Sequence, residues 1–180
     1  DSMQLSDNKK KILLPVLAVI CFAAAFFLWS GSKNESVPYD RDTLVEISGD
    51  GISAQLPQGT SLKKADGVPF YCVWQDGLLA AGYDTDEQIA QSGHDASMSL
   101  EDYAEICAAD APTDVTVQTD ENGNVCFSYE INSNGTPLYY YVAFLRGTDR
   151  FWTCNFVCSQ DLEDEYATYF STWASLLRAE

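Results

Sequence analysis

The single histidine, His94, is the first residue to weigh as a catalyst, because it stands beside Asp95 in a polar stretch. A Ser-His-Asp catalyst needs three groups fixed within hydrogen-bond reach, and adjacency in the sequence does not supply that geometry. The chain also lacks the Gly-x-Ser-x-Gly turn that presents a nucleophilic serine in α/β-hydrolases. We therefore predict that His94 is a solvated loop residue and not part of a catalytic site.

Two acidic stretches have the ligand type that a hard cation prefers. Asp84, Asp86 and Glu87 lie in the first, and Asp120 opens the second, which reads Asp-Glu-Asn-Gly. A calcium loop supplies about six to eight oxygens, and an EF-hand adds a glycine and a bidentate glutamate at fixed positions that both stretches lack. The Asn-Gly pair of the second stretch instead predicts a hairpin turn. We expect no metal ion and no cofactor.

Six cysteines are present, and all but Cys21 lie outside the apolar run near the N-terminus. Cys154 and Cys158 fall four residues apart on a predicted strand, which places them roughly 13 Å apart and too far for a bond to each other. With one histidine and no CxxC pair, no zinc site is predicted. Buried thiols that pack as small apolar side chains are the favoured interpretation. One or two disulfides are the alternative for the five cysteines Cys72, Cys107, Cys126, Cys154 and Cys158.

The distribution of charge excludes nucleic acid as a partner. Residues 1–33 carry four Lys and two Asp, whereas the rest of the chain carries six basic and 25 acidic side chains. The whole chain has a net charge of −17. Phosphate groups and anionic lipid head groups repel a body of this charge. Any partner is therefore basic or neutral where it touches the chain.

Six residues are candidates for binding a protein partner. An acidic run crowds the start of a predicted helix, where it complements the positive end of the helix dipole and offers a docking surface for a basic partner. Aromatic residues of a predicted strand add interface anchors if they face outward, although sheet packing is their more common use. The six are Asp161, Glu163, Asp164, Glu165, Tyr139 and Tyr141.

An apolar run, Ile12–Trp29, follows three lysines and contains 18 residues without a charge. As a helix it is about 27 Å long, close to the hydrocarbon thickness of a bilayer. The lysines before it and Trp29 at its far end favour a cytoplasmic N-terminus in the cell membrane. A cleaved signal peptide is the alternative, but the run is longer than a usual signal core and lacks an Ala-x-Ala site. The predicted order is a cytoplasmic segment (1–11), a single transmembrane helix (12–29), a linker (30–43) and an extracytoplasmic domain (44–180).

Hydrophobic periodicity predicts an α+β domain after the linker. The period-2 segments are expected to be strands in antiparallel order because short turns join them. They lie at 44–48, 52–56, 70–75, 78–83, 115–119, 125–131, 138–146 and 151–158. Residues 84–97 are expected to form an exposed loop. Ser99 caps a predicted helix that ends by Pro112, and a second amphipathic helix covers 160–178. The strand at 138–145 is apolar on both faces, which predicts a central position.

Three segments give this layout a family resemblance. They are Gly51-Ile-Ser-Ala-Gln-Leu-Pro57-x-Gly59, the helix opening Ser99-Leu-Glu-Asp-Tyr, and the ending Phe151-Trp-x-Cys-x-Phe-x-Cys158 … Tyr166 … Phe170-x-x-Trp173. Together they resemble PsbP-like domains over about residues 44–178. The resemblance implies an α/β/α sandwich around an antiparallel sheet. It also implies an accessory or protein-binding role, with no shared catalytic residues.

These observations favour a membrane-anchored, extracytoplasmic binding or accessory module that docks a protein partner at the cell envelope and is not an enzyme. One alternative is a ligand- or calcium-binding sensor domain in which the loop at 84–97 covers a pocket. The other is a hydrolase that uses scattered carboxylates such as Asp84 and Glu130, whose spacing does not favour that role.

Overall fold

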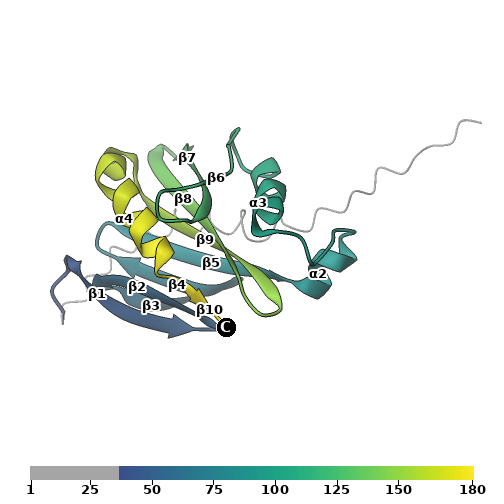
Figure 1. Ribbon diagram of the computed structural model, residues 1–180. Helices are drawn as coiled ribbons and strands as arrows, with labels where there is room; N and C mark the ends of the chain where they lie inside the picture. The colour runs from purple at the N-terminus through teal and green to yellow at the C-terminus, as the bar shows by residue number, and fades with distance from the viewer. Residues whose placement is uncertain (1–36) are drawn as a thin grey trace, which may run out of the picture.

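A computed structural model of the chain describes residues 37–180 (Figure 1). The predicted cytoplasmic segment, the predicted transmembrane helix and most of the predicted linker lie outside the described residues. Within residues 37–180, no helix is both long and apolar enough to cross a bilayer.

Two antiparallel sheets and a few helices make up the domain, which confirms the predicted α+β class. The main sheet has seven strands in the order β3-β4-β5-β9-β8-β7-β6, and the small sheet has the order β1-β2-β10. The strands are β1 (Asp40–Gly49), β2 (Ile52–Gln58), β3 (Ser61–Ala65), β4 (Val68–Trp74), β5 (Gly77–Thr85), β6 (Gln118–Thr119), β7 (Val125–Ser133), β8 (Thr136–Arg146), β9 (Arg150–Ser159) and β10 (Arg178–Ala179). The helices are α2 (Asp86–Gln91), α3 (Leu100–Ala109), the short 3-10 helix η1 (Gln160–Leu162) and α4 (Glu163–Ser175).

Each face of the main sheet carries its own apolar layer. On one face, Trp173 and Phe170 of α4 pack with Trp74 and Phe156, and the small sheet adds Leu56. The opposite face packs against α2 and α3, which lie together at one end of the main sheet (Figure 1). The order of layers is therefore helix and small sheet, main sheet, and helices.

The predicted central strand is central. β8 pairs with β9 on one side and β7 on the other, and its residues Leu138–Phe144 are all buried. A strand buried on both faces gains from apolar residues at every position, which is why the Leu-Tyr-Tyr-Tyr-Val-Ala-Phe run shows no alternation. β9 lies between β8 and β5 and is buried in the same way.

The structure differs from the sequence prediction at four places. β1 begins at Asp40, inside the predicted linker, and β3 is an additional, mostly exposed strand that its Leu-Lys-Lys sequence did not suggest. The predicted loop at 84–97 contains α2, because Thr85 and Gln88 form a reciprocal capping box. The predicted strand at 115–119 shortens to β6.

The last predicted helix also ends early. α4 stops at Ser175, and the chain then forms β10, which pairs with Ile52 and Ser53 of β2. Ser99 does cap α3, accepting a hydrogen bond from the backbone N–H of Asp102, as predicted. The five described cysteines are free and buried, which confirms the thiol interpretation and shows the disulfide alternative to be wrong for them.

Candidate interaction surface

The acidic start of α4 is only partly a free surface. Asp161 and Asp164 are exposed, and Glu163 is half-buried beside Glu130 of β7. We name these four residues, Glu130, Asp161, Glu163 and Asp164, the α4 acidic surface. Leu162 stands at the N-cap of α4 and provides no side-chain cap, so the carboxylates of the first turn complement the helix dipole there.

The carboxylates of the α4 acidic surface repel one another. Burial, a hydrogen bond with Glu130 and the charges of Glu130 and Asp164 all raise the pKa of Glu163. Gln160 donates its side-chain amide to Glu130. Among residues 37–180, none of these four carboxylates forms an ion pair with a lysine or arginine. The surface therefore holds like charges close together without a counter-charge from the described part of the chain.

Glu165, the fourth acidic residue predicted to bind a partner, is already engaged within the domain. It forms an ion pair with Arg41 of β1, and its carboxylate raises the pKa of that guanidinium. The guanidinium of Arg41 also lies over the rings of Tyr166 and Tyr169, with Cζ 5.4 Å and 4.6 Å from the ring centroids. Glu165 therefore stabilises the fold, and the expectation that it is free for a partner is corrected.

Two hydrogen bonds that involve tyrosine hydroxyls extend this contact between β1 and α4. The hydroxyls of Tyr39 and Tyr166 lie 2.7 Å apart, and that of Tyr169 donates to Asp42 at 2.8 Å. We call the whole set (Tyr39, Arg41, Asp42, Glu165, Tyr166 and Tyr169) the β1–α4 clamp. The sequence prediction missed it because residues 39–42 read as a polar linker. The Tyr-Asp-Arg-Asp pattern, with an aromatic and an arginine among acids, was the signal available.

Tyr139 and Tyr141 do not lie on the surface. Their exposed fractions are 4% and 6%, and both belong to the layer beneath α4. Tyr139 stacks on Phe170 with ring centroids 6.2 Å apart, and burial raises its pKa to about 12. Their alternation on β8 points them into the core, so sheet packing, the more common use of such residues, accounts for both.

Tyr141 takes part in a hydrogen-bond network around Asp120, in the turn between β6 and β7. Asp120 Oδ2 accepts hydrogen bonds from the Tyr141 hydroxyl at 2.5 Å, the Ser171 hydroxyl at 2.6 Å and the Asn124 amide at 2.9 Å. Its Oδ1 accepts the backbone N–H groups of Asn122 and Asn124. Burial opposes ionisation, but these bonds outweigh it and lower the pKa of Asp120 to about 2. The predicted turn is confirmed, and its aspartate fastens β7 and β8 to α4.

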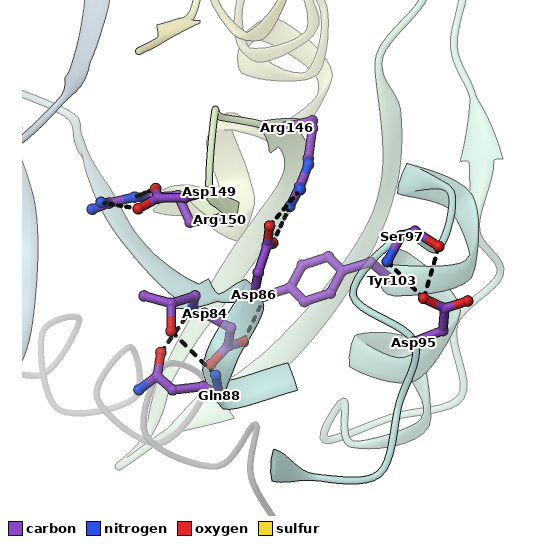
Figure 2. A network of polar contacts seen from close by, with 10 residues as sticks. Asp84, Asp86, Gln88, Asp95, Ser97, Tyr103, Arg146, Asp149 and Arg150 are labelled. Carbon is purple, nitrogen blue, oxygen red and sulfur yellow. Dashed lines mark hydrogen bonds and ion pairs between the residues drawn. The ribbon is translucent and has the colours of Figure 1, made fainter. Parts of the chain in front are cut away.

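The other acidic stretch, Asp84–Glu87, does not converge on a cation. Figure 2 shows Asp84 turned toward Tyr103 and Asp86 turned toward Arg146. The Tyr103 hydroxyl donates to Asp84 at 2.7 Å, and Arg146 binds Asp86 through two bonds of 2.6 Å and 2.9 Å. Within residues 37–180, no three Asp, Glu, His or Cys side chains are grouped to hold a metal ion. The described residues therefore contain no set of metal ligands for the calcium-binding sensor alternative.

Asp84 is the buried member of this network. Burial raises its pKa, and the hydrogen bond from Tyr103 opposes that rise. The Tyr103 hydroxyl also lies 3.2 Å from that of Thr153, and the nearby Cys107 thiol has a pKa raised by burial to about 12. A thiol that remains protonated is a poor nucleophile, so Cys107 packs as an apolar residue.

The residues weighed as catalysts are not brought together. His94 is exposed in the loop after α2, and Asp95 beside it accepts from Ser97 (Figure 2). Asp84 lies opposite Phe151, and Glu130 lies at the level of Cys158, seven residues further along β9. Seven residues of strand span roughly 23 Å. Asp84 and Glu130 therefore cannot act on one substrate atom.

Comparison with solved structures shows which known fold the domain is similar to. The solution structure of cyanobacterial PsbP (CyanoP) from Synechocystis matches 77% of this chain and 93% of its own, with a TM-score of 0.50 and 13% identity. Residues 37–180 thus have a PsbP-like fold. The sequence matches no protein-family model and no curated protein. The PsbP-like layout inferred from three sequence segments is confirmed at the level of the fold.

Two weaker likenesses support no further statement about the PsbP-like domain. A protein from Bacteroides thetaiotaomicron matches 78% of the chain and 49% of its own length, with 13% identity and a TM-score of 0.47. LpqN, which is involved in cell envelope biogenesis of Mycobacterium tuberculosis, matches 79% of the chain and 90% of its own. Its identity is 10% and its TM-score is 0.41.

Proposed function

We propose that this chain is a non-enzymatic, membrane-tethered binding module that docks a basic surface of a protein partner on the outer side of the cell membrane. The observation that carries the proposal is the α4 acidic surface, where like charges lie together without a described counter-charge. The tether is the apolar run Ile12–Trp29. A role as a docking module, and not as a catalyst, accords with buried thiols and scattered carboxylates.

Electrostatics favours a basic partner at this surface. Burial is the main cause of the raised pKa of Glu163, and the neighbouring carboxylates Glu130 and Asp164 add to it. Lysine or arginine side chains brought to the α4 acidic surface relieve this repulsion between carboxylates. Exposed charges of this kind steer association and fix orientation more than they add affinity, and they make binding sensitive to salt. The partner must therefore present a positive patch, and its association rate must fall as ionic strength rises.

The β1–α4 clamp determines where this surface lies with respect to the tether. Arg41 and Glu165 fasten the start of the domain to the first turns of α4, next to the α4 acidic surface. Between Trp29 and Tyr39 lie residues 30–38, which reach about 30 Å when fully extended. A domain held on so short a tether keeps this surface near the bilayer, where anionic lipid repels it and a basic protein does not. Tethering also raises the effective concentration for a partner in the same membrane.

The experiment that tests this proposal is chemical crosslinking of the full chain in intact membranes, read by mass spectrometry at low and at moderate salt. We expect one dominant crosslinked protein whose recovery falls as salt rises. Recovery of the same protein unchanged at both salt concentrations would contradict the electrostatic part of the proposal. Absence of a specific crosslink at either concentration would contradict the docking function itself.

A further inference from the structure

Two Asn-Gly pairs, Asn122-Gly123 and Asn134-Gly135, lie in the turns before and after β7. Glycine after asparagine has a chemical consequence, because it carries no side chain to shield its backbone nitrogen. That nitrogen can attack the side-chain amide of the asparagine and close a five-membered ring. The two pairs have the same local sequence, so a difference in their reactivity comes from the fold.

The first pair is fastened to α4. The side-chain amide of Asn122 donates to the Ser171 hydroxyl at 2.7 Å, and its backbone N–H donates to Asp120 Oδ1 at 2.9 Å. The backbone N–H of Gly123 donates to the carbonyl of Asp120 at 3.0 Å. Ser171 in turn donates to the Asp120 carboxylate, so this turn opens only if it separates from α4. Both reacting groups of the first pair are therefore held by hydrogen bonds.

The second pair lies at the tip of the β7–β8 hairpin, beyond the rest of the main sheet. β9 pairs with β8 from Leu138 onward, and β6 pairs with β7 at its other end, at Val125 and Cys126. Within the described part of the chain, the strand residues on either side of this turn, up to Pro137, therefore pair only with each other. A two-stranded ribbon is marginally stable in water, so this tip opens at a lower free-energy cost than the sheet does.

The reacting groups of the second pair are accessible. Asn134 and Gly135 are exposed, and their φ values of 52° and 87° are those of a type I′ turn. Among residues 37–180, the side-chain amide of Asn134 has no hydrogen-bond partner. A Cβ at Gly135 would meet no atom within 4 Å, so neighbouring side chains do not cover the site. The backbone N–H of Gly135 donates to Oδ1 of the exposed Asn132 at 2.8 Å, and this bond shields the nitrogen while the turn is closed.

We propose that Asn134 is a site of deamidation in the folded chain and that Asn122 is protected from the same reaction. When the tip opens, the Gly135 nitrogen loses its proton to hydroxide and attacks Cγ of Asn134. The new N–Cγ bond closes a succinimide ring, and the Cγ–Nδ2 bond breaks. Ammonia leaves with a proton from water, which restores the hydroxide. Water then adds to either ring carbonyl and opens the ring to aspartate or isoaspartate.

The reaction changes the hairpin more than it changes the α4 acidic surface. Either product adds a negative charge about 13 Å along β7 from Glu130, which exceeds the screening length of about 8 Å at physiological salt. Isoaspartate also inserts a carbon atom into the main chain. The two-residue turn between Ser133 and Thr136 cannot take up this extra atom and keep its register. The modification therefore loosens the tip of the hairpin, and it does not depend on the proposed function.

A time course of peptide mapping on the full chain in micelles, at mildly alkaline pH, tests the inference. Mass spectrometry follows the gain in mass at each asparagine when an amide NH2 is replaced by OH. In the folded chain, we expect Asn134 to convert at least about fivefold faster than Asn122. In urea the two rates should converge, because unfolding removes the contacts that distinguish the two turns. Equal rates in the folded chain, or conversion of Asn134 only after unfolding, would overturn the proposal.

Two variants test the cause assigned at each turn. Asn132→Ala removes the acceptor of the Gly135 N–H, so it should raise the rate at Asn134 about threefold and leave the rate at Asn122 unchanged. Ser171→Ala removes the acceptor of the Asn122 amide and should raise only the rate at Asn122. An unchanged rate at Asn134 in the first variant would contradict the assigned shield. A slow Asn122 in the second would contradict protection by α4. The wild-type comparison decides the proposal even if a variant fails to fold.

Discussion

The guanidinium of Arg41 lies over the ring of Tyr169, with Cζ 4.6 Å from the ring centroid, and so joins the first strand of the domain to its last helix. The two residues are far apart in sequence, and the same arginine also pairs with Glu165. This contact fixes the place where the chain enters the domain next to the α4 acidic surface. It links the tether to the surface that we propose docks a partner.

Removing this arginine should weaken the domain. Arg41→Ala loses contacts with two aromatic rings and one ion pair, so we expect the free energy of unfolding to fall by about 1–2 kcal/mol. Arg41→Lys keeps the charge but not the planar stacking, so its free energy of unfolding should lie between those of the wild type and Arg41→Ala. Urea unfolding of the full chain in micelles measures this. Lys64→Ala, at an exposed position of β3, is the control and should change stability by less than about 0.5 kcal/mol. Equal losses at Arg41 and Lys64 would show that the β1–α4 clamp does not contribute.

Asp120→Asn should destabilise the domain at neutral pH by about 2 kcal/mol, because an amide nitrogen then faces groups that donate to the carboxylate. The pKa of Asp120 is about 2 in the folded chain, below its ordinary 3.8. Its stabilising contribution is therefore present above pH 3.8 and is lost as pH falls toward 2. The difference between wild type and variant should shrink over that range. Equal stability at pH 7, measured by thermal unfolding, would refute the role of this network.

Asp84→Asn should change stability in the opposite direction to Asp120→Asn. Burial raises the folded pKa of Asp84 above its ordinary 3.8, so its contribution is fully present below pH 3.8 and is lost as pH rises through the folded pKa. The amide removes a buried charge and can still accept the Tyr103 hydroxyl. We expect a gain of about 1 kcal/mol at pH 7 that disappears in acid. Tyr103→Phe, which leaves the carboxylate without this donor, should instead destabilise. A loss of stability on Asp84→Asn at pH 7 would contradict this account.

Local patterns predicted most of the sheet. The turns at Asp50-Gly51 and Asn134-Gly135, the period-2 strands and the doubly apolar run at 138–145 each depend on neighbours in the sequence, and the structure agrees with them. The turn expected at Asp76-Gly77 lies one residue earlier, because Gly77 pairs with Trp74 and begins β5. The Ser99 cap of α3 is another local signal that was read correctly. Such features can be predicted from the sequence because the backbone geometry they require is set within a few residues.

The parts that sequence reasoning missed depend on distant partners. Arg41 and Tyr39 read as linker residues because their partners on α4 lie at the other end of the chain. The sequence predicts Tyr141 as an interface anchor because its acceptor, Asp120, lies across a turn and is not evident from the strand's own pattern. β10 is too short to show periodicity and forms only because β2 offers it an edge. The capping box of α2 is a local signal in the sequence, and the predicted loop at 84–97 overlooks it.

Gly77 is required by its neighbours and not by its backbone conformation. A Cβ there would lie 2.6 Å from the Val157 carbonyl oxygen and 2.8 Å from the Trp74 ring. Gly77→Ala should therefore cost about 3 kcal/mol or more and reduce soluble yield. Gly123→Ala is the matched control, because its Cβ meets open space and only the positive φ of 81° is strained. That change should cost about 1–2 kcal/mol. Equal effects in thermal unfolding would contradict the close packing of β4, β5 and β9.

The most direct test of the docking proposal compares two variants with the same loss of charge at two helix starts. The first, Asp161→Asn/Glu163→Gln/Asp164→Asn, neutralises the α4 acidic surface. The control, Glu101→Gln/Asp102→Asn/Glu105→Gln, neutralises three exposed acids of α3. Both full-length variants and the wild type are crosslinked in intact membranes, and the dominant partner is quantified at low salt.

The proposal predicts that the α4 variant loses the partner, by roughly tenfold or more, while the α3 variant retains it within about twofold. This result would assign the docking surface to the start of α4. Equal recovery of the partner from all three proteins would contradict the assignment. Equal loss from both variants would show that only the overall negative charge matters.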